Sequence, residues 1–228
     1  MVDQTSPSGR KGLSFGLVLT AVVVLVGFAQ VSRDQADERT ALQMILADLE
    51  TDSAEMMAVL NRGHTAERAV MWVLRNQDLP QDSIMRGLVP LFYYTSYQQP
   101  RTGYLNLLNA GRLTVISNPE LRQRFVNYYE VTHPYMWEFY TIYMKIYGEF
   151  KETTAPYIFT EVEPEGETFR TSFRMEWVRP WSEMRSDPQF RYKLSELGAA
   201  GSQFAFRLEP VLETNGELRT AIRAELGM

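Results

Sequence analysis

The helical class of the chain is most evident in residues 118–150, which read NPELRQRFVNYYEVTHPYMWEFYTIYMKIYGEF. The opening Asn-Pro-Glu supplies an N-cap side chain, a proline suited to the first helical turn and an acid at the positive end of the helix dipole. Mostly apolar side chains then recur at steps of three and four, which predicts a long helix with a packing seam. We expect Pro134 to bend this helix near Glu130. The predicted seam consists of Leu121, Phe125, Tyr128, Thr132, Met136, Phe139, Tyr143, Ile146 and Phe150.

The segments before this helix share its periodicity. Residues 33–61 carry apolar side chains at steps of three and four, and no proline or glycine separates them from the apolar segment that precedes them. The simplest prediction is one long helix that ends at residues 61–63 (Asn-Arg-Gly), followed by a new helix from Thr65. Residues 102–111 predict a short helix that a glycine ends.

The segments after it repeat the same start signal. Residues 186–188 (Ser-Asp-Pro) predict a helix that runs to about Leu197. We expect the Gly-Ala-Ala-Gly of residues 198–201 to interrupt or end that helix, and small residues of this kind are typical of a close helix packing point. A last helix follows, and Pro210 and residues 215–216 (Asn-Gly) disfavour helix in its middle.

Residues 157–178 change to a period of two, which is the spacing of a strand. Turn-forming residues 163–166 (Glu-Pro-Glu-Gly) divide the segment into two halves. We therefore predict a β-hairpin carried on the helical body. Because a lone hairpin is marginal in water, its apolar face must lie on the helices, on the membrane surface or on another protein. The apolar residues that alternate with polar ones are Phe169, Phe173, Met175 and Trp177.

An uncharged apolar run covers residues 12–32, and its 19-residue centre, Leu13–Val31, is close to the length that a helix needs to cross a bilayer. We expect a retained membrane anchor. One alternative is a cleaved signal peptide, with a small-residue cleavage site at residues 27–29, although the run is longer than the usual signal core. Another is a buried core helix. The anchor residues are Leu13, Phe15, Leu17, Val22, Leu25 and Phe28.

Composition excludes several classes of function. The chain has 228 residues, no cysteine and a net charge of −5, so disulfides, thiolate metal sites and general nucleic-acid affinity are not expected. No phosphate-binding, nucleophile-elbow or zinc-protease motif occurs. His64 and His133 have no metal-ligand spacing, and we interpret them as structural. The alternating acids of the hairpin could hold Ca²⁺, but a solvated turn is favoured because their spacing is not that of an EF-hand: Glu161, Glu163, Glu165 and Glu167. We predict no enzyme, no metal and no cofactor.

Residues 125–150 contain more tyrosines and tryptophans than one packing seam can use. Exposed Tyr and Trp are typical of protein interfaces and of membrane headgroup regions. This surplus, together with the hairpin, is the sequence feature that favours a binding role. The predicted interface residues are Tyr135, Trp137, Tyr140, Phe169, Phe173 and Trp177.

The chain resembles a group of uncharacterised bacterial proteins that have one N-terminal membrane span, a long helix and a helical domain. Three segments carry the resemblance: residues 111–122 (GRLTVISNPELR), the pair Tyr128-Tyr129, and residues 186–191 (SDPQFR). The likeness covers most of residues 33–226. It implies a fold, and it brings no activity with it because the shared residues are helix starts and stops.

These observations predict a mainly α fold, in which an N-terminal transmembrane helix continues into a helical bundle with a β-hairpin near residues 157–178. The expected parts are a cytoplasmic tail (1–11), the membrane helix (12–32), a helical domain (33–156), a hairpin arm (157–180) and C-terminal helices packed on the helical domain (181–228). Positive charges flanking the span tie in number, and the Arg10-Lys11 pair favours a cytoplasmic N-terminus with a periplasmic domain at a bacterial inner membrane.

The function that we expect is a non-enzymatic accessory or scaffold subunit of a larger membrane complex, with the lipid bilayer and other membrane-protein subunits as partners. No nucleic acid and no small-molecule substrate is predicted. The alternative is a membrane-anchored sensor or small-ligand-binding domain that signals through a partner. A third hypothesis, a hydrolase, would need two facing carboxylates with shifted pKa values in a cleft.

Overall fold

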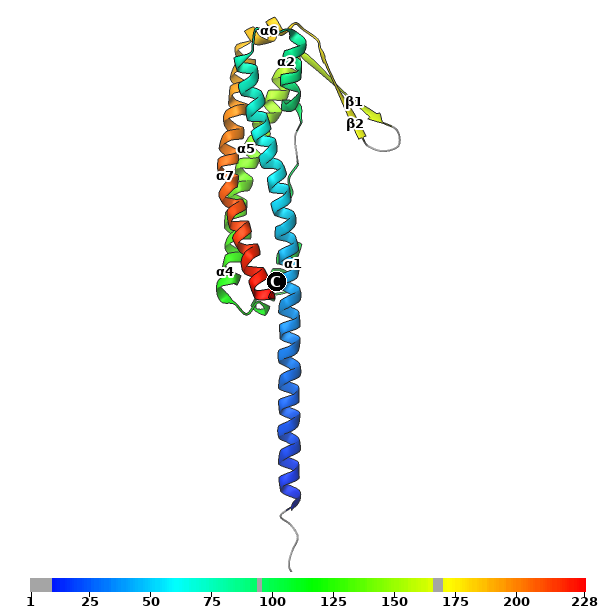
Figure 1. Cartoon of the computed structure of the whole chain (residues 1–228), viewed down its shortest axis with the longest axis vertical. Coiled ribbons are helices and arrows are strands. Elements are labelled where there is room, and N and C mark those ends of the chain that lie inside the picture. The colour runs from blue at the N-terminus through cyan, green and yellow to red at the C-terminus, as the bar shows by residue number, and fades with distance from the viewer. Residues whose placement is uncertain (1–9, 94–95, 166–169) are drawn as a thin grey trace, which may run out of the picture.

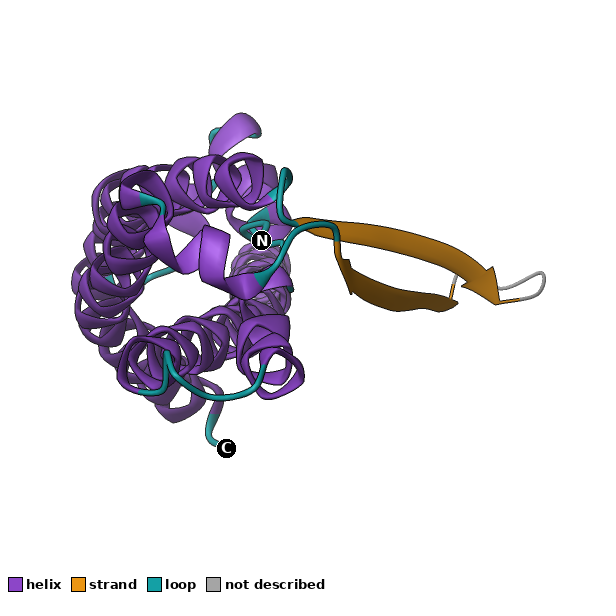
Figure 2. Ribbon diagram, turned by 90° about the horizontal axis from the view of Figure 1, so that it is seen from above, coloured by secondary structure: helices purple, strands orange, loops and turns teal. Residues whose placement is uncertain are grey.

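The computed structural model describes residues 10–93, 96–165 and 170–228, and it describes side chains for residues 30, 33–93, 96–160 and 175–228. Long helices lie side by side as a bundle, from which a two-stranded hairpin projects (Figures 1 and 2). The helices are α1 (Arg10–Arg75), α2 (Gln81–Leu88), α3 (Thr102–Asn109), α4 (Pro119–Asn127), α5 (His133–Thr154), α6 (Trp181–Ser186) and α7 (Pro188–Leu226). Short 3-10 turns cover Val89–Phe92 and Leu113–Val115, a π-helix covers Tyr128–Thr132, and the strands are β1 (Ile158–Glu165) and β2 (Arg170–Trp177).

The prediction that α1 ends at residues 61–63 is wrong, because the helix continues to Arg75. Gly63 is buried where α1 crosses α7, and a Cβ placed on it would lie 3.7 Å from the carbonyl oxygen of Gly201. A glycine in a helix interior destabilises the helix by about 1 kcal/mol relative to alanine. Packing against α7 offsets that loss here, so a residue that resembles a stop signal lies inside the helix.

The predicted break in the C-terminal helices is also wrong, since α7 is a single helix from Pro188 to Leu226 that contains Pro210. The expectation of close packing at residues 198–201 is confirmed: a Cβ on Gly198 would lie 2.8 Å from a methyl carbon of Val70 on α1. Tertiary packing along both long helices therefore overrides the local preference of glycine and proline.

The helix starts and one glycine stop are confirmed in atomic detail. The Asn118 side chain accepts hydrogen bonds from the N–H groups of Glu120 and Leu121, both at 3.1 Å, and begins α4. Asp187 begins α7 by accepting from the N–H of Gln189 at 2.8 Å. Gly111 follows α3 with φ of +65°, a conformation that residues with a Cβ rarely adopt.

The predicted hairpin is confirmed as an antiparallel pair of β1 and β2. Its base is fixed to the bundle: Ile158 is buried, and the Trp177 ring lies 6.1 Å from that of Trp181, centroid to centroid. The paired strands then leave the bundle and project from it (Figure 2). The register places Glu161 opposite Arg174.

The N-terminal part of α1 extends beyond the bundle, which packs along the C-terminal part of that helix (Figure 1). Among the described side chains of α1, the first buried ones are those of Ala41 and Leu42. Among the residues with described side chains, no helix is both long enough and apolar enough to cross a membrane. The predicted span at residues 12–32 has a helical backbone, and apart from Gln30 its side chains lie outside that set.

Candidate functional site

Five polar side chains meet in the apolar interior of the bundle. They come from α1, from the connector before α3, from the π-helix, from α5 and from α7, and each is exposed over 3% of its surface or less. Burying polar groups is unfavourable unless they bond to one another, so such a cluster is the most chemically distinctive part of the described core. We call it the core network: Asp52, Tyr97, Tyr128, His133 and Asn215.

The π-helix brings two members of the core network together. The backbone N–H of His133 donates to the carbonyl of Tyr128, five residues earlier, where an α-helix would bond four residues earlier. The side chains of both residues therefore lie on the same face of the chain, and their rings are 6.2 Å apart, centroid to centroid, in an edge-on contact. Irregular π-turns of this kind are frequent at functional sites.

The carboxylate of Asp52 is the acceptor at the centre of the core network. Tyr97 donates its hydroxyl to one oxygen of Asp52, and Tyr128 donates to the other. Asn215 supports the second of these bonds: its side-chain amide donates to the hydroxyl oxygen of Tyr128 at 3.0 Å and to the carbonyl of Leu49 at 3.1 Å. Asp52 therefore links α1 to the rest of the bundle through hydroxyl donors.

The contact between Tyr97 and His133 fixes the tautomer of the imidazole. Nε2 of His133 bonds to the hydroxyl of Tyr97, and the two rings stack with centroids 5.4 Å apart. The single hydroxyl proton of Tyr97 already goes to Asp52, so Nε2 of His133 must carry the proton that it donates to the Tyr97 oxygen. Nδ1 is then the nitrogen that keeps a lone pair.

Burial moves the pKa values of the two titratable groups in opposite directions. Burial raises the pKa of Asp52 to about 6, although the hydrogen bonds from Tyr128 and Tyr97 act against the rise. Burial lowers the pKa of His133 to about 4, and the positive charge of Arg101 lowers it further. Burial and the neighbouring Asp52 raise the pKa of both tyrosine hydroxyls. At neutral pH the imidazole is neutral and Asp52 is mainly ionised.

A surface pocket lies directly over His133. Its volume is about 540 Å³, and its wall combines the connector before α3 with the start of α5. None of the lining residues is a serine, threonine or cysteine, so the wall offers hydrogen bonds and an indole face and lacks a hydroxyl or thiol nucleophile. The lining residues are Gln98, Gln99, Arg101, His133, Pro134, Trp137 and Glu138. The arrangement is suited to binding.

The predicted interface residues of α5 do not share one surface. Tyr135 is half exposed, and its hydroxyl accepts a hydrogen bond from Arg207 of α7 at 2.7 Å. Trp137 is 42% exposed and lines the pocket over His133. Tyr140, predicted as an exposed interface residue, is buried instead, and its hydroxyl accepts a hydrogen bond from the backbone N–H of Tyr97 at 3.2 Å. It belongs to the core, and its side chain offers little surface to a partner.

The remaining predicted residues fall at the hairpin and at the N-terminus. Trp177 is partly buried at the base of the hairpin, where it packs against the core. Phe169 lies outside the described residues, and the side chain of Phe173 lies outside the described side chains, as do those of the six anchor residues. Within the part of the chain whose side chains are described, no group of acids and histidines is arranged to hold a metal ion.

Of the core network, His133 is a candidate in the sequence, whereas Asp52, Tyr97 and Asn215 are found only in the structure. Two of the missed residues carry a signal in the sequence. Asp52 falls three residues after Leu49, on the apolar seam of α1, and Asn215 falls four residues after Val211 on the seam of α7. A polar residue at a seam position predicts a buried polar contact.

Comparison with known proteins adds no assignment: no family model, no curated protein and no solved structure matches the chain. The resemblance to single-span bacterial proteins stays a prediction.

Proposed function

We propose that the protein is a non-enzymatic accessory or scaffold subunit, anchored by residues 12–32 in a bacterial inner membrane, with its bundle on the periplasmic side. Its hairpin binds another subunit of a larger membrane complex. The observation that carries this proposal is the hairpin, which is held at its base and projects from the bundle (Figure 2). A two-stranded hairpin alone in water is marginal, so a partner that covers it supplies the missing packing.

The position of the hairpin makes a protein a better partner than the anchoring bilayer. Trp181, at the base of the hairpin, donates its indole N–H to the carbonyl of Gln77, just past the C-terminal end of α1. The residues of α1 between the proposed span and Arg75 extend over roughly 65 Å at 1.5 Å per residue. The base of the hairpin therefore lies far from a membrane that holds the N-terminal end of the same helix.

The exposed side of α5 offers a second contact surface. Tyr135 and Ile142 of α5 follow Val131 of the preceding π-helix at steps of four and seven, which places the three on one helix face, and each is at least half exposed. Phe206 of α7 is also exposed. Aromatic and aliphatic side chains of this kind are the usual anchors of protein interfaces.

Replacing the hairpin tests the scaffold proposal. The register pairs Phe159 with Glu176, so an Asn-Gly turn can close the chain between these two residues while Ile158 and Trp177 stay in place at the base. We expect the shortened protein to fold and to remain in the membrane fraction. It should lose the subunits that co-purify with the full chain after mild detergent extraction. Co-purification of the same subunits with both forms, or a full chain that extracts as a solitary monomer, would contradict the proposal.

A second candidate function is small-ligand binding at the pocket over His133, with the signal passed to a partner. The observation that favours it is the juxtaposition of an exposed indole, Trp137, with a polar network that joins five parts of the bundle. Nitrogen NMR of the imidazoles tests it, because the chain has two histidines and His64→Gln assigns them. A binding fragment should shift the His133 signals. A fragment screen in which only His64 responds would argue against this function.

A further inference from the structure

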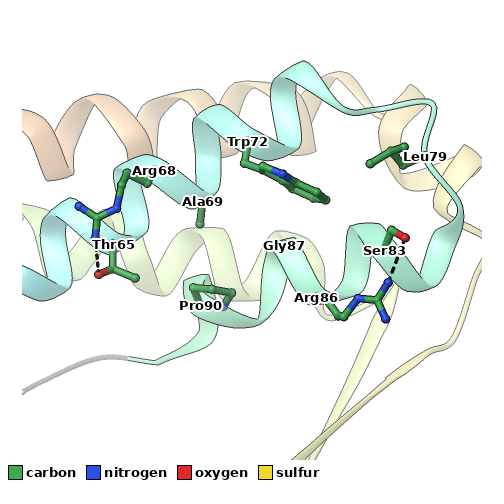
Figure 3. A pocket seen from close by; sticks show the side chains of 9 residues that line it. All are labelled: Thr65, Arg68, Ala69, Trp72, Leu79, Ser83, Arg86, Gly87 and Pro90. Atoms are coloured by element: carbon green, nitrogen blue, oxygen red, sulfur yellow. Dashed lines mark hydrogen bonds between the residues drawn. The ribbon is translucent and has the colours of Figure 1, made fainter.

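A second pocket lies between the C-terminal part of α1 and α2, apart from the core network (Figure 3). Its volume is about 530 Å³, within the range of roughly 300–1,000 Å³ that small-molecule sites occupy. We call it the α1–α2 pocket. Its lining residues are Thr65, Arg68, Ala69, Trp72, Leu79, Ser83, Arg86, Gly87 and Pro90.

The shape of the α1–α2 pocket depends on the contact between Trp72 and Gly87. A Cβ on Gly87 would lie 2.1 Å from Cζ3 of Trp72. The indole therefore occupies the space that a side chain at position 87 would need. The indole reaches from α1 toward α2 and stays 37% exposed (Figure 3). A flat aromatic surface is thus held between the two helices and remains open to a ligand.

The charge of the α1–α2 pocket is entirely positive. Arg68 donates to the hydroxyl oxygen of Thr65 at 3.1 Å, and Arg86 donates to that of Ser83 at 3.2 Å. Both acceptors are neutral, and no aspartate or glutamate is among the lining residues, although the chain as a whole carries a net charge of −5. In the described part of the chain, neither arginine forms an ion pair. Each guanidinium has five N–H donors, so most of them remain available to a ligand.

We propose that the α1–α2 pocket binds a small anion that has a flat apolar group, such as an aromatic carboxylate. The anionic oxygens bond to Arg68 and Arg86, because a planar guanidinium matches the two oxygens of a carboxylate. The flat group stacks on Trp72. A site of this size favours a small molecule over a protein surface, and the positive lining disfavours neutral and cationic ligands. This binding site is additional to the scaffold function and does not depend on the hairpin.

Calorimetric titration of the full chain in non-ionic detergent tests the proposal, with 2-naphthoate as the probe and 2-naphthamide as its neutral counterpart. We expect saturable binding of the naphthoate and none of the amide. The double variant Arg68→Gln, Arg86→Gln should weaken binding by about tenfold or more, since it removes both charged hydrogen-bond donors. Both arginines are exposed, so the variant should fold. Arg191→Gln is the matched control, because Arg191 is an exposed arginine that does not line the pocket.

Further measurements distinguish the contribution of stacking on Trp72 from that of the two arginine charges. Trp72→Leu should weaken naphthoate binding while leaving the arginines in place. Inorganic phosphate should displace naphthoate only weakly, because it has no group to stack on the indole. Three results would overturn the proposal: equal binding of the amide, displacement by phosphate at the concentration of naphthoate itself, or no saturable binding at millimolar concentrations.

Discussion

Asp52 is the central hydrogen-bond acceptor in the interior of the bundle. In the described structure its carboxylate lacks a cationic partner within hydrogen-bond distance, since the nearest candidate is neutral His133, with 3.8 Å between Nε2 and the carboxylate oxygen. Hydroxyl donors from Tyr97 and Tyr128 take the place of a counter-ion. A buried carboxylate held in this way stays protonated to higher pH than one in water, whereas the buried imidazole loses its proton at lower pH.

These two pKa shifts make opposite contributions to stability. The pKa of Asp52 rises from 3.8 to about 6 on folding, so its contribution is full below pH 3.8 and is lost as the pH rises through about 6. The pKa of His133 falls from 6.5 to about 4, so its contribution is full above pH 6.5 and is lost as the pH falls through about 4. Between pH 4 and 6 the two slopes oppose each other in the native protein.

Single substitutions should expose each slope. In Asp52→Asn only the pH dependence that His133 contributes remains. The free energy of unfolding of this variant, relative to that of the native protein, should therefore rise between pH 4 and 6. In His133→Gln only the pH dependence that Asp52 contributes remains. The free energy of unfolding of this variant, relative to that of the native protein, should fall over the same range. Each change should be on the order of 2 kcal/mol, because one pKa unit corresponds to about 1.4 kcal/mol. Urea unfolding at both pH values measures the difference, and parallel slopes in the two variants would refute the assignment.

Gly103 lets α3 approach α1 closely. A Cβ on this residue would lie 2.9 Å from the backbone carbonyl carbon of Met44, and its N–H donates to Asp48 at 2.6 Å. Gly103→Ala should therefore push α3 away and lower the free energy of unfolding by about 1–3 kcal/mol. Gly148→Ala is the control: nothing lies within 4 Å of its Cβ, and the change should raise helix stability by up to about 1 kcal/mol. Equal effects in thermal unfolding would show that the close approach is unimportant.

At the scale of the helix, the π-turn decides which residues of α5 face the core. The buried positions run through Phe125 to the adjacent pair Tyr128 and Tyr129, and His133 follows five residues after Tyr128. From there the steps of three and four resume, so Tyr140 and Tyr147 are buried where the plain periodicity predicted Phe139 and Ile146. One extra residue in the turn thus explains why Tyr140 is buried.

Removing that extra residue should restore a plain α-helix with the same buried face. Val131 lies in the π-turn and is 59% exposed, so its deletion removes little packing. Because a proline ring clashes with the carbonyl four residues earlier in an uninterrupted helix, the deletion belongs in a Pro134→Ala background. We expect its free energy of unfolding to stay within about 1 kcal/mol of that background, with the contact between Tyr97 and His133 retained.

The matched control is deletion of Ile142, which is 54% exposed and lies in the regular part of α5. That deletion rotates every later residue by about 100°, so Tyr143 and Tyr147 leave the core and the bundle should lose several kcal/mol or fail to fold. Circular dichroism during urea unfolding compares the two. Similar losses from both deletions would mean that the π-turn does not act as a one-residue insertion.

Local signals account for most of the elements that the sequence predicts correctly. Asn118 and Asp187 begin helices because their side chains bond nearby N–H groups, and the hairpin follows from a period-two pattern within a few residues. The errors depend on distant contacts. Gly63 lies inside a helix because α7 packs against it, and the core network joins residues up to 163 positions apart. No local pattern predicts which polar seam residues will meet.

At the scale of the whole molecule, the length of α1 is the feature that needs a partner. The helix has 66 residues, and among its described side chains burial begins at Ala41. The part that precedes the core extends beyond the bundle and includes the uncharged run of residues 12–32 (Figure 1). An isolated helix in water is marginal, and a bilayer would stabilise this segment by enclosing its apolar side chains.

Deleting residues 1–32 should therefore change the location of the protein in the cell while leaving the folding of the bundle unchanged. We expect the full chain to remain in the membrane fraction after an alkaline carbonate wash, and the shortened chain to be found in the supernatant. The shortened chain should unfold at nearly the same urea concentration, because every described core residue from Ala41 onward is kept. It should also recover less of the co-purifying subunits, because it keeps the hairpin but no longer lies in the same membrane as these subunits. A shortened chain that keeps its location and its associates, or a mature protein that begins after Ala29, would show that the helix is not a retained anchor.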